Sequence, residues 1–271
     1  MPEKSERLDI LLMEICNVPS REKAKQLIMA GEVLVNNQVV DKPSKLVSID
    51  SVITIQNTCP YVSRGGYKLE KALKYFDIDV KGKVAIDIGS STGGFTDCLL
   101  QNGAVFVYAV DVGYGQLDWK LRNDQRVGVF ERTNIRYVKP DLFNREIDIA
   151  TIDVSFISLD KVIPVVYSLI SDSGQVIALI KPQFEAGKKL VGKGGVVKDA
   201  QTHYIVIRNV CEMAIQNGFE MKGITYSPIK GPSGNIEYLI YLQKSKNRQD
   251  IYIFDDTINK VVIESHNILN N

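Results

Sequence analysis

The sequence has few of the residues from which metal centres and nucleophilic triads are built. Its 271 residues include two histidines, His203 and His266, which stand in no companion motif, so mechanisms based on a Cys/His or Ser/His pair have few candidates. There are four cysteines, which form no C-x-x-C pair and lie far apart, at Cys16, Cys59, Cys98 and Cys211. This usage disfavours a disulfide framework or a zinc site and is typical of a cytosolic protein.

The sequence also lacks an excess of one charge and a long apolar run. Lys+Arg is 33 and Asp+Glu is 32, and the net charge of +1 excludes a globally basic nucleic-acid binder but leaves room for local basic patches. The longest stretches without a charged residue, 51–63 and 98–110, are 13 residues long, whereas a membrane-spanning helix needs about 20 apolar residues. No apolar stretch follows the charged first residues, so we expect no secretory signal.

What is present suits one large and one small domain, divided near residue 60. In the first part, apolar residues at helical spacing predict a helix over 8–15, which Pro19 ends, and Ser20 is a suitable N-cap for a second helix from Arg21 to Ala30. Valines on both sides of Asn36-Asn37 predict a hairpin, and a strand is expected within 49–55. These elements form a compact α+β unit.

The second part alternates strands and helices, which is the pattern of an α/β fold with a parallel sheet covered on both faces. Strands are predicted at 84–88, 105–110, 148–152, 176–180 and 237–242. Helices are predicted at 68–76 and 205–217, and the final segment 251–269 is amphipathic.

A glycine-rich turn, Gly89–Thr96, follows the strand that carries Asp87. Glycines allow the backbone to approach a ligand closely, and the next helix presents its N-terminus to that ligand. No lysine follows Gly93 or Gly94, so the turn is no Walker A loop, and Ser91 stands where the dinucleotide fingerprint needs its second glycine. A purely structural turn stays open as an alternative.

The turn resembles the first motif of S-adenosylmethionine (SAM) methyltransferases, which holds the methionine end of the cofactor. Asp111 closes the next strand, about 20 residues further on, where an acidic side chain can accept hydrogen bonds from ribose hydroxyls. The pair therefore predicts a cofactor site.

Three charged residues lie at the ends of predicted strands, where open α/β sheets bind their ligands: Asp153, Lys181 and Glu237. A fourth, Lys68, follows Arg64-Gly65-Gly66 on the first helix of the large part. Any one of them alone is more simply explained as a solvated charge. Together, two lysines and two acids can share one cleft without net charge.

Such a set has a clear chemical use. A hydroxyl must lose its proton to attack a methyl sulfonium, and a lysine serves as base when burial or a neighbouring cation lowers its pKa. Lys181 is the predicted base, with Lys68 as the neighbouring cation and Asp153 and Glu237 orienting the ammonium groups. Placement of the oxygen in line with the methyl group supplies much of the rate, and no metal is required.

The motifs extend over nearly the whole chain. Residues 7–55 resemble the S4 RNA-binding domain through Arg7-Leu8-Asp9, Ser20-Arg21, Ala24, Leu27-Ile28, Gly31, Val33, Val35-Asn36 and Lys42-Pro43-Ser44. Residues 61–242 resemble the FtsJ-type ribose 2′-O-methyltransferase domain through Val62–Gly66, Gly89–Thr96, Asp111–Leu117, Asp153–Leu159, Lys181–Glu185, Gly194–Val197 and Gly231–Glu237. The combination resembles the TlyA family, ribosomal RNA 2′-O-methyltransferases also called hemolysins.

The resemblance implies a Rossmann-like SAM-dependent methyltransferase sheet with a small N-terminal α+β S4 domain. Expected bounds are 1–58 for the S4-like domain, 59–62 for a linker, 63–243 for the methyltransferase domain and 244–271 for a helical extension. The family's catalytic K-D-K-E set falls on Lys68, Asp153, Lys181 and Glu237. Its cofactor positions fall on Asp87, Gly89, Ser90, Ser91, Thr92, Gly93, Gly94, Phe95, Asp111 and Val112, with the adenine side at Thr133 and Asn134.

RNA binding follows from placement rather than from composition. Residues 1–60 contain seven Lys/Arg and eight acids, so composition alone leaves a solvated small domain as an alternative. However, basic side chains cluster at the starts of two helices, where they can meet phosphates. The predicted RNA-binding residues are Arg7, Ser20, Arg21, Lys23, Lys25 and Arg64.

The predicted function is SAM-dependent 2′-O-methylation of ribose, at cytidine, in 16S and/or 23S ribosomal RNA within ribosomal subunits. The expected product is S-adenosylhomocysteine, the expected compartment is the cytoplasm, and no metal, membrane or obligate protein partner is implied. One alternative is a membrane-acting hemolysin, but the acids of segment 251–269 match a membrane-surface helix poorly. Another is a non-catalytic RNA-binding assembly factor, against which the intact four-residue set argues.

Overall fold

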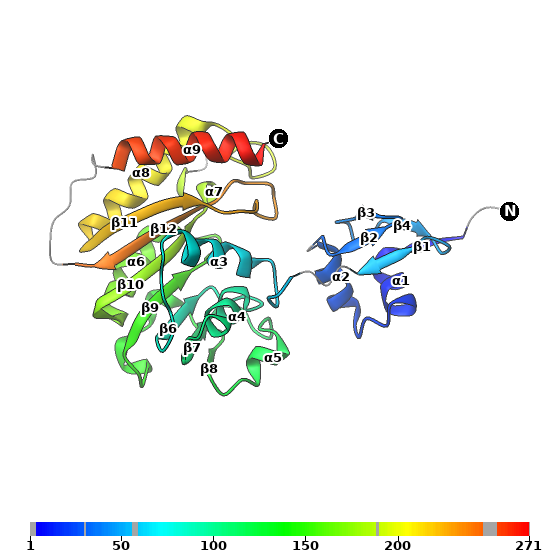
Figure 1. Cartoon of the computed structure of the whole chain (residues 1–271), viewed down its shortest axis with the longest axis horizontal. Helices are drawn as coiled ribbons and strands as arrows, with labels where there is room; N and C mark the ends of the chain where they lie inside the picture. Colours follow the sequence, from blue (N-terminus) through cyan, green and yellow to red (C-terminus); the bar gives the residue numbers. More distant parts are fainter. Residues whose placement is uncertain (1–3, 30, 56–58, 188–189, 246–253, 271) are drawn as a thin grey trace. The chain divides into compact units, whose positions relative to one another are not determined.

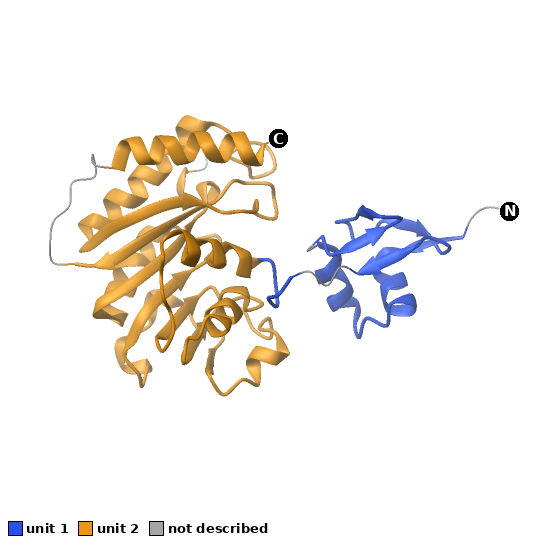
Figure 2. Ribbon diagram, viewed as in Figure 1, with its two compact units in different colours: residues 1–64 blue, residues 65–271 orange. Residues whose placement is uncertain are grey.

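The chain divides into two compact units, residues 1–64 and 65–271 (Figure 2). The computed structural model describes residues 4–29, 31–55, 59–187, 190–245 and 254–270. Each unit buries its own apolar side chains, so each has the packing that an independent domain needs.

The first unit has two helices and two small antiparallel sheets. Helices α1 (Leu8–Ile15) and α2 (Arg21–Met29) pack on a core that includes Leu8, Leu12 and Ile28, all of them fully buried. The sheets have the orders β1-β4 and β3-β2-β5, with strands β1 (Ser5–Arg7), β2 (Val33–Val35), β3 (Gln38–Val39), β4 (Leu46–Ser48) and β5 (Ile53–Ile55).

The predicted hairpin is present between β2 and β3. Asn36 and Asn37 have φ values of 50° and 65°, which is the left-handed pair that a two-residue type I′ turn requires and that asparagine tolerates. Strands β1 and β4 were not predicted, because three residues are too few to show an alternating pattern. The predicted end of the second helix, Ala30, lies outside the described residues.

The second unit is built on a seven-stranded sheet of order β11-β12-β10-β9-β6-β7-β8 (Figure 1). All neighbouring strands are parallel except around β12, which runs antiparallel to both β10 and β11. The strands are β6 (Val84–Ile88), β7 (Phe106–Val110), β8 (Val127–Phe130), β9 (Ile147–Ile152), β10 (Ile170–Ile180), β11 (Phe219–Tyr226) and β12 (Tyr238–Lys244).

Helices cover both faces of this sheet, as the alternating pattern predicts. One core joins strand residues to α6 (Ile163–Leu169), α8 (Ala200–Gln216) and the C-terminal helix α9 (Asp255–Leu269). The helices α3 (Gly65–Tyr75) and α4 (Gly94–Gln101) pack against each other (Figure 1). The described residues of the unit also include the short helices α5 (Trp119–Arg122) and α7 (Pro182–Glu185) and 3-10 turns at 135–137, 140–142 and 159–161.

The structure differs from the prediction mainly at element ends. Helix α3 starts at Gly65, three residues before the predicted 68, and β10 starts at Ile170, six residues before the predicted 176. Strands β8 and β11 and helix α6 were not predicted. In the extension, β12 continues to Lys244 and α9 covers 255–269, whereas residues 246–253 lie outside the described part.

The two histidines, which are far apart in sequence, meet between α8 and α9. His203 is fully buried, and its Nε2 lies 3.0 Å from the carbonyl oxygen of Val197, to which it donates. Its Nδ1 lies 2.8 Å from the hydroxyl of Tyr238 and 2.9 Å from Nε2 of His266. Burial, together with the nearby His266, lowers the pKa of His203 to about 4.

This burial makes stability depend on pH. The unfolded chain protonates His203 near pH 6.5 and the folded chain only near pH 4, so protons bind the unfolded state preferentially between these values. The stabilisation is complete above pH 6.5 and is lost as the pH falls. We expect His203 to account for about 2 kcal/mol of the decrease in unfolding free energy between pH 7 and pH 5.

Urea unfolding at both pH values checks this expectation. His203→Gln lowers stability at pH 7 because the network loses a partner, but it flattens the pH dependence. An unchanged difference between pH 7 and pH 5 in this variant would assign the pH effect to other groups.

Candidate active site

The positions of three charged residues of the site follow directly from the strand order. Asp153 comes straight after β9 and Lys181 straight after β10, and the carboxyl ends of parallel strands meet at one edge of the sheet. Glu237 comes before β12 rather than after it. Because β12 is antiparallel, with Tyr238 paired to Ile180, its beginning lies at the same edge.

The side chains of the predicted four-residue set are in contact. Lys68 Nζ, from α3, lies 2.6 Å from Glu237 Oε2 and 4.0 Å from Asp153 Oδ2. Lys181 Nζ lies 2.6 Å from Asp153 Oδ1. The carboxylate of Asp153 therefore lies between the two ammonium groups, and Glu237 contacts the ammonium group of Lys68.

The set is mostly removed from water. The exposed fractions of the side chains are 9% for Lys68, 10% for Lys181 and 1% for Glu237, whereas Asp153 keeps 20%. Burial opposes ionisation of Asp153, but the charges of Lys68 and Lys181 outweigh it and lower the pKa of the carboxyl. Burial raises the pKa of Glu237, although Lys68 opposes the shift. Of the two acids, Asp153 therefore has the stronger preference for the ionised form.

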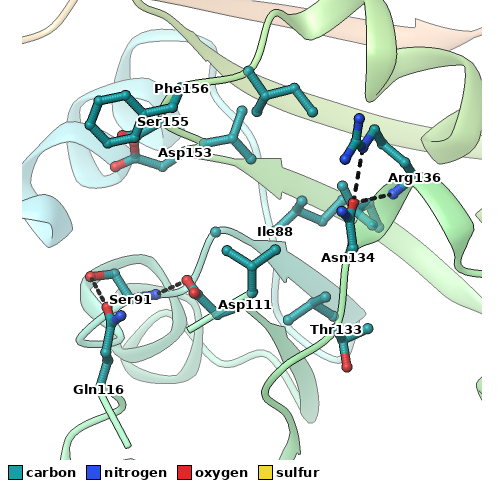
Figure 3. A pocket seen from close by; sticks show the side chains of 16 residues that line it. Ile88, Ser91, Asp111, Gln116, Thr133, Asn134, Arg136, Asp153, Ser155 and Phe156 are labelled. Atoms are coloured by element: carbon teal, nitrogen blue, oxygen red, sulfur yellow. Dashed lines mark hydrogen bonds between the residues drawn. The ribbon is translucent and has the colours of Figure 1, made fainter. Parts of the chain in front are cut away.

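A cavity of about 430 Å³ opens beside this set at the carboxyl edge of the sheet. Figure 3 shows Asp153, Ser155 and Phe156 on one side of it, Ser91, Asp111 and Gln116 on another, and Thr133, Asn134 and Arg136 on a third. The volume lies within the range of small-molecule sites, roughly 300–1,000 Å³.

Gly89 lets the turn after β6 approach Asp153. Its φ is +83°, and a Cβ atom there would lie 2.5 Å from the carbonyl oxygen of Asp153. No other residue type fits both the left-handed backbone and this contact. The glycine thus joins the turn to the charged set.

Asp111 organises the other side of the turn. One carboxylate oxygen accepts a hydrogen bond from the backbone N–H of Ser91 at 2.8 Å (Figure 3), and the other accepts one from the backbone N–H of Gly113 at 2.6 Å. The Ser91 hydroxyl lies 3.4 Å from the side-chain oxygen of Gln116. The carboxylate is thereby fixed in the cavity, where its remaining lone pairs can accept hydrogen bonds from hydroxyl groups of a ligand.

The predicted cofactor residues fall into two groups. Those that line the cavity are Gly89, Ser91, Asp111, Val112, Thr133 and Asn134. Those that do not line it are Asp87, Ser90, Thr92, Gly93, Gly94 and Phe95. A direct cofactor contact stays a prediction for both groups.

Asp87 has a supporting position under the turn. It is fully buried and accepts hydrogen bonds from the hydroxyls of Thr96 at 2.7 Å and Thr151 at 3.1 Å. Burial raises the pKa of Asp87 to about 7, against the effect of these two hydrogen bonds. Its carboxyl group joins the end of β6 to α4 and β9.

Several lining residues were not singled out from the sequence. Ser155 Oγ accepts a hydrogen bond from Lys181 Nζ at 2.9 Å. Phe156 is 92% exposed with a left-handed φ of 63°, and its ring lies 5.1 Å from that of Phe184. Both lie in the motif Asp153–Leu159, and Gln116 lies in the motif Asp111–Leu117. Their place in these motifs was the only feature of the sequence that pointed to the site. No feature of the sequence pointed to Arg136.

Asn235 and Gly231 lie in the glycine-rich stretch that leads to Glu237. Asn235 is buried, donates to the carbonyl oxygen of Gly195 at 2.9 Å and accepts from the backbone N–H of Val197 at 3.0 Å. A Cβ at Gly231 would lie 2.5 Å from Glu237 Oε1. Asn235 therefore joins the glycine-rich stretches at 194–197 and 231–237, and the absence of a side chain at Gly231 leaves room for the carboxylate of Glu237.

The importance of the close approach at Gly89 can be tested. We expect Gly89→Ala to lower the unfolding free energy by about 1–3 kcal/mol, through left-handed strain and the clash with Asp153, and to weaken cofactor binding at least tenfold. Calorimetric titration with SAM and urea unfolding measure both effects. The control is Gly82→Ala, where φ is +76° but no atom lies within 4 Å of a Cβ. Equal behaviour of the two variants would contradict the role of the contact.

Two of the predicted RNA-binding residues of the first unit bind a buried acid. The guanidinium groups of Arg7 and Arg21 bind the carboxylate of Asp9, with Nε to oxygen distances of 2.9 Å and 3.0 Å. The hydrogen bond from Arg7 is the main reason that the pKa of Asp9 is lowered to about 2, with Arg21 contributing and burial opposing. The arginines are thus fixed in place while keeping 37% and 44% of their side-chain surface exposed.

The other predicted residues of that set have more local positions. Ser20 accepts from the backbone N–H of Lys23 at 3.2 Å at the start of α2, and Lys25 Nζ lies 3.7 Å from Glu22. Arg64 is half-buried at the end of the unit. Contact of these six residues with RNA stays a prediction.

Within the described part of the chain, no three or more His, Cys, Asp or Glu side chains are grouped so as to hold a metal ion. Over the same residues, no helix combines the length and the apolar character needed to cross a membrane.

Comparison with known proteins decides the family. The sequence pattern of FtsJ-like methyltransferases matches residues 61–244, and that of the S4 domain matches residues 6–53. The chain is 43% identical to the 16S/23S rRNA (cytidine-2′-O)-methyltransferase TlyA of Mycobacterium tuberculosis, over 89% of this chain and 91% of that protein. The chain belongs to the TlyA family of FtsJ-like methyltransferases.

Two further relatives match almost from end to end. YqxC of Bacillus subtilis, provisionally named an rRNA methyltransferase, is 50% identical over 99% of this chain and 97% of its own length. A solved structure from Streptococcus thermophilus, provisionally titled a hemolysin, has 43% identity and a TM-score of 0.80 over 99% of this chain and 98% of that one. The fold of this TlyA-family member is thus the Rossmann-like methyltransferase sheet with an N-terminal S4 domain.

Proposed function

We propose that this protein methylates the 2′-hydroxyl of cytidine in ribosomal RNA, using SAM as methyl donor. One observation carries the proposal: Lys68, Asp153, Lys181 and Glu237 converge beside a cavity that Gly89 also lines, with contacts of 2.6, 2.6 and 4.0 Å. The substrate follows from the TlyA relative that is named for cytidine in 16S and 23S rRNA.

The residues present fit SAM. The backbone at Gly89 can approach a ligand closely, because a side chain there is excluded. The carboxylate of Asp111 is fixed at the end of β7, where acids of such folds accept from ribose hydroxyls. Thr133 and Asn134 line the far side of the cavity and are proposed to face the adenine. When bound, SAM supplies an electrophilic methyl group on a sulfonium.

Lys181 is the proposed base. Its Nζ lies against Asp153, which lines the cavity, and against the exposed Ser155, so it is near the entrance from which a ribose would come. In its neutral form the amine takes the proton of the 2′-hydroxyl. The ionised Asp153 orients Lys181 and stabilises the ammonium that forms.

Lys68 and Glu237 are proposed to hold Asp153 and Lys181 in position. The ammonium of Lys68 contacts both acids, and Glu237 is almost fully buried. A positive group next to Asp153 keeps that carboxylate ionised without adding net charge to the cleft. Correct placement of the hydroxyl by such a rigid set supplies much of the rate enhancement.

The RNA is proposed to reach this set from the side of Phe156. An exposed aromatic ring at the rim of the cavity can stack on a nucleobase that is displaced from its own stack. Arg136, which lines the same cavity, can contact a phosphate. The S4 unit, with Arg7, Ser20, Arg21, Lys23, Lys25 and Arg64, would bind the folded rRNA of a ribosomal subunit.

The proposal also covers the metal requirement, the product, the compartment and the partners. Because a lysine and a sulfonium supply both the base and the leaving group, no metal is required, and the product is S-adenosylhomocysteine. We propose that the protein acts in the cytoplasm on ribosomal subunits, without a membrane and without an obligate protein partner.

Mapping of 2′-O-methylated riboses in 16S and 23S rRNA tests the proposal, with cells that contain or lack this protein. We expect at least one cytidine to lose its methyl group when the protein is absent and to regain it when purified protein and SAM are added to the subunits. Identical maps would overturn the proposal. Failure to bind SAM would favour an RNA-binding assembly factor, and lysis of washed red cells without SAM would favour a hemolysin.

A further inference from the structure

A second cavity, of about 650 Å³, lies along the outer side of α3 and is lined by Tyr67, Glu70, Lys71, Lys74, Tyr75, Pro228 and Ile229. We call it the α3 groove. Its lining combines two tyrosine rings with two lysines, and Tyr75 and the side chain of Lys74 are exposed by 59% and 75%. None of these residues belongs to the methylation site described above.

The α3 groove is tied to that site by helix geometry. Residues 67, 71 and 75 follow one another at intervals of four and therefore lie on one face of α3. Lys68, which contacts Glu237 and Asp153, is displaced from the centre of that face by about 60°. One rigid helix thus carries a catalytic lysine on one face and the groove on the adjoining face.

We propose that the α3 groove binds the RNA strand next to the target nucleotide, with phosphates on Lys71 and Lys74 and a base stacked on Tyr67 or Tyr75. The proposal rests on the function proposed above. It extends the contact with the substrate from the target nucleotide to the neighbouring nucleotides. Helix α3 would then fix the distance between the neighbouring nucleotides and the methylation site.

The lining favours RNA over a protein partner. Stacking of bases on aromatic rings, combined with a positive track for the backbone, is the usual arrangement for single-stranded nucleic acid. Lys74 Nζ lies 2.7 Å from Glu70 in an exposed pair, which costs little to open when a phosphate arrives. The apolar part of the lining, Pro228 and Ile229, is small and suits the face of a base or sugar.

Lys71 has a special environment in this groove. Its ammonium lies 3.3 Å from the centroid of the Tyr226 ring on β11, and the Tyr226 hydroxyl bonds to Glu264 of α9 at 3.3 Å. The charged groups of α3 that also line the groove are Glu70 and Lys74. Burial lowers the pKa of Lys71 to about 8, although Glu264 opposes the shift.

A phosphate next to Lys71 would favour its charged form, so binding takes up a proton above pH 8. We expect the affinity for RNA to fall as the pH rises from 7 to 9. Lys71→Arg keeps its charge over this range and should lose most of that dependence.

Steady-state methylation of ribosomal subunits by the full-length protein tests the groove. Lys71→Ala/Lys74→Ala is compared with Lys81→Ala/Lys222→Ala, which removes the same charge from two exposed lysines outside the groove. We expect about a tenfold higher KM for the subunit in the groove variant only, with unchanged SAM affinity and thermal stability. The slope of log K against log salt should fall by about 1.4, for two phosphates of a single strand.

The stacking is tested separately. Tyr67→Ala/Tyr75→Ala should raise the KM for the subunit about tenfold or more, whereas Tyr67→Phe/Tyr75→Phe should restore it, since a phenyl ring still stacks.

Each other outcome has a defined meaning. If wild-type protein methylates subunits and the groove variants show the same KM, the groove proposal is wrong and the function stands. If the groove variants lose affinity for subunits but bind protein-free rRNA as wild type does, the groove contacts a ribosomal protein, and the RNA proposal is overturned. If wild-type protein methylates no subunit, the proposed function itself fails.

Discussion

Replacing Lys181 by alanine is expected to lower the rate of methyl transfer by about 10²–10⁴-fold, because the variant removes the group proposed to take the proton of the ribose hydroxyl. The KM for the ribosomal subunit should change little, since only 10% of the Lys181 side chain is exposed. Single-turnover transfer of labelled methyl from SAM to subunits measures the effect.

The variant Lys181→Arg tests whether Lys181 acts as a base or only through its positive charge. Arginine can keep the contact with Asp153, but its guanidinium does not lose a proton in proteins, so it should be as inactive as alanine. SAM affinity of both variants should match that of wild type. Activity near the wild-type level in Lys181→Arg would show that Lys181 acts through its charge and that another group is the base.

The second large effect is expected at the ion pair between Lys68 and Glu237. Glu237→Ala leaves the ammonium of Lys68, whose side chain is only 9% exposed, without its 2.6 Å partner. Removing one member of a buried pair typically costs 3–5 kcal/mol, so we expect a loss of about 3–5 kcal/mol in unfolding free energy, measured by urea unfolding. Methylation should also fall, because Lys68 can then move away from Asp153.

A double variant separates folding from catalysis at this pair. Lys68→Met/Glu237→Leu replaces both charges by apolar groups of similar size, and such replacements are often neutral or stabilising. We expect unfolding free energy near that of wild type and methylation still strongly reduced. A stable and fully active double variant would show that the pair is structural only.

The candidate site was predictable to an unusual extent, because its residues come at strand ends. Asp111, Asp153 and Lys181 each follow an apolar strand whose end the sequence marks clearly, and the structure brings the last two to 2.6 Å of each other. The contacts that hold them were not predictable. Ser155 has no pattern of its own, and its bond to Lys181 depends on how the loop after β9 folds back.

The α3 groove was likewise only partly predictable from the sequence. Tyr67, Lys71 and Tyr75 share a helical face, which the spacing shows, but an amphipathic helix does not reveal which of its polar residues line a cavity. Pro228 and Ile229 come from a loop more than 150 residues away, so only the packed unit shows that they close the groove.

By itself the sequence determined the alternation of strands and helices, the glycine turn, the small N-terminal unit and the identity of the four charged residues, because these depend on local spacing and side-chain chemistry. The tertiary structure alone decided that the four meet. Glu237 precedes its strand while Asp153 and Lys181 follow theirs, and only the antiparallel insertion of β12 beside β10 places all three at one edge. Strand direction is set by long-range pairing in the sheet, which leaves no mark on the residues next to Glu237.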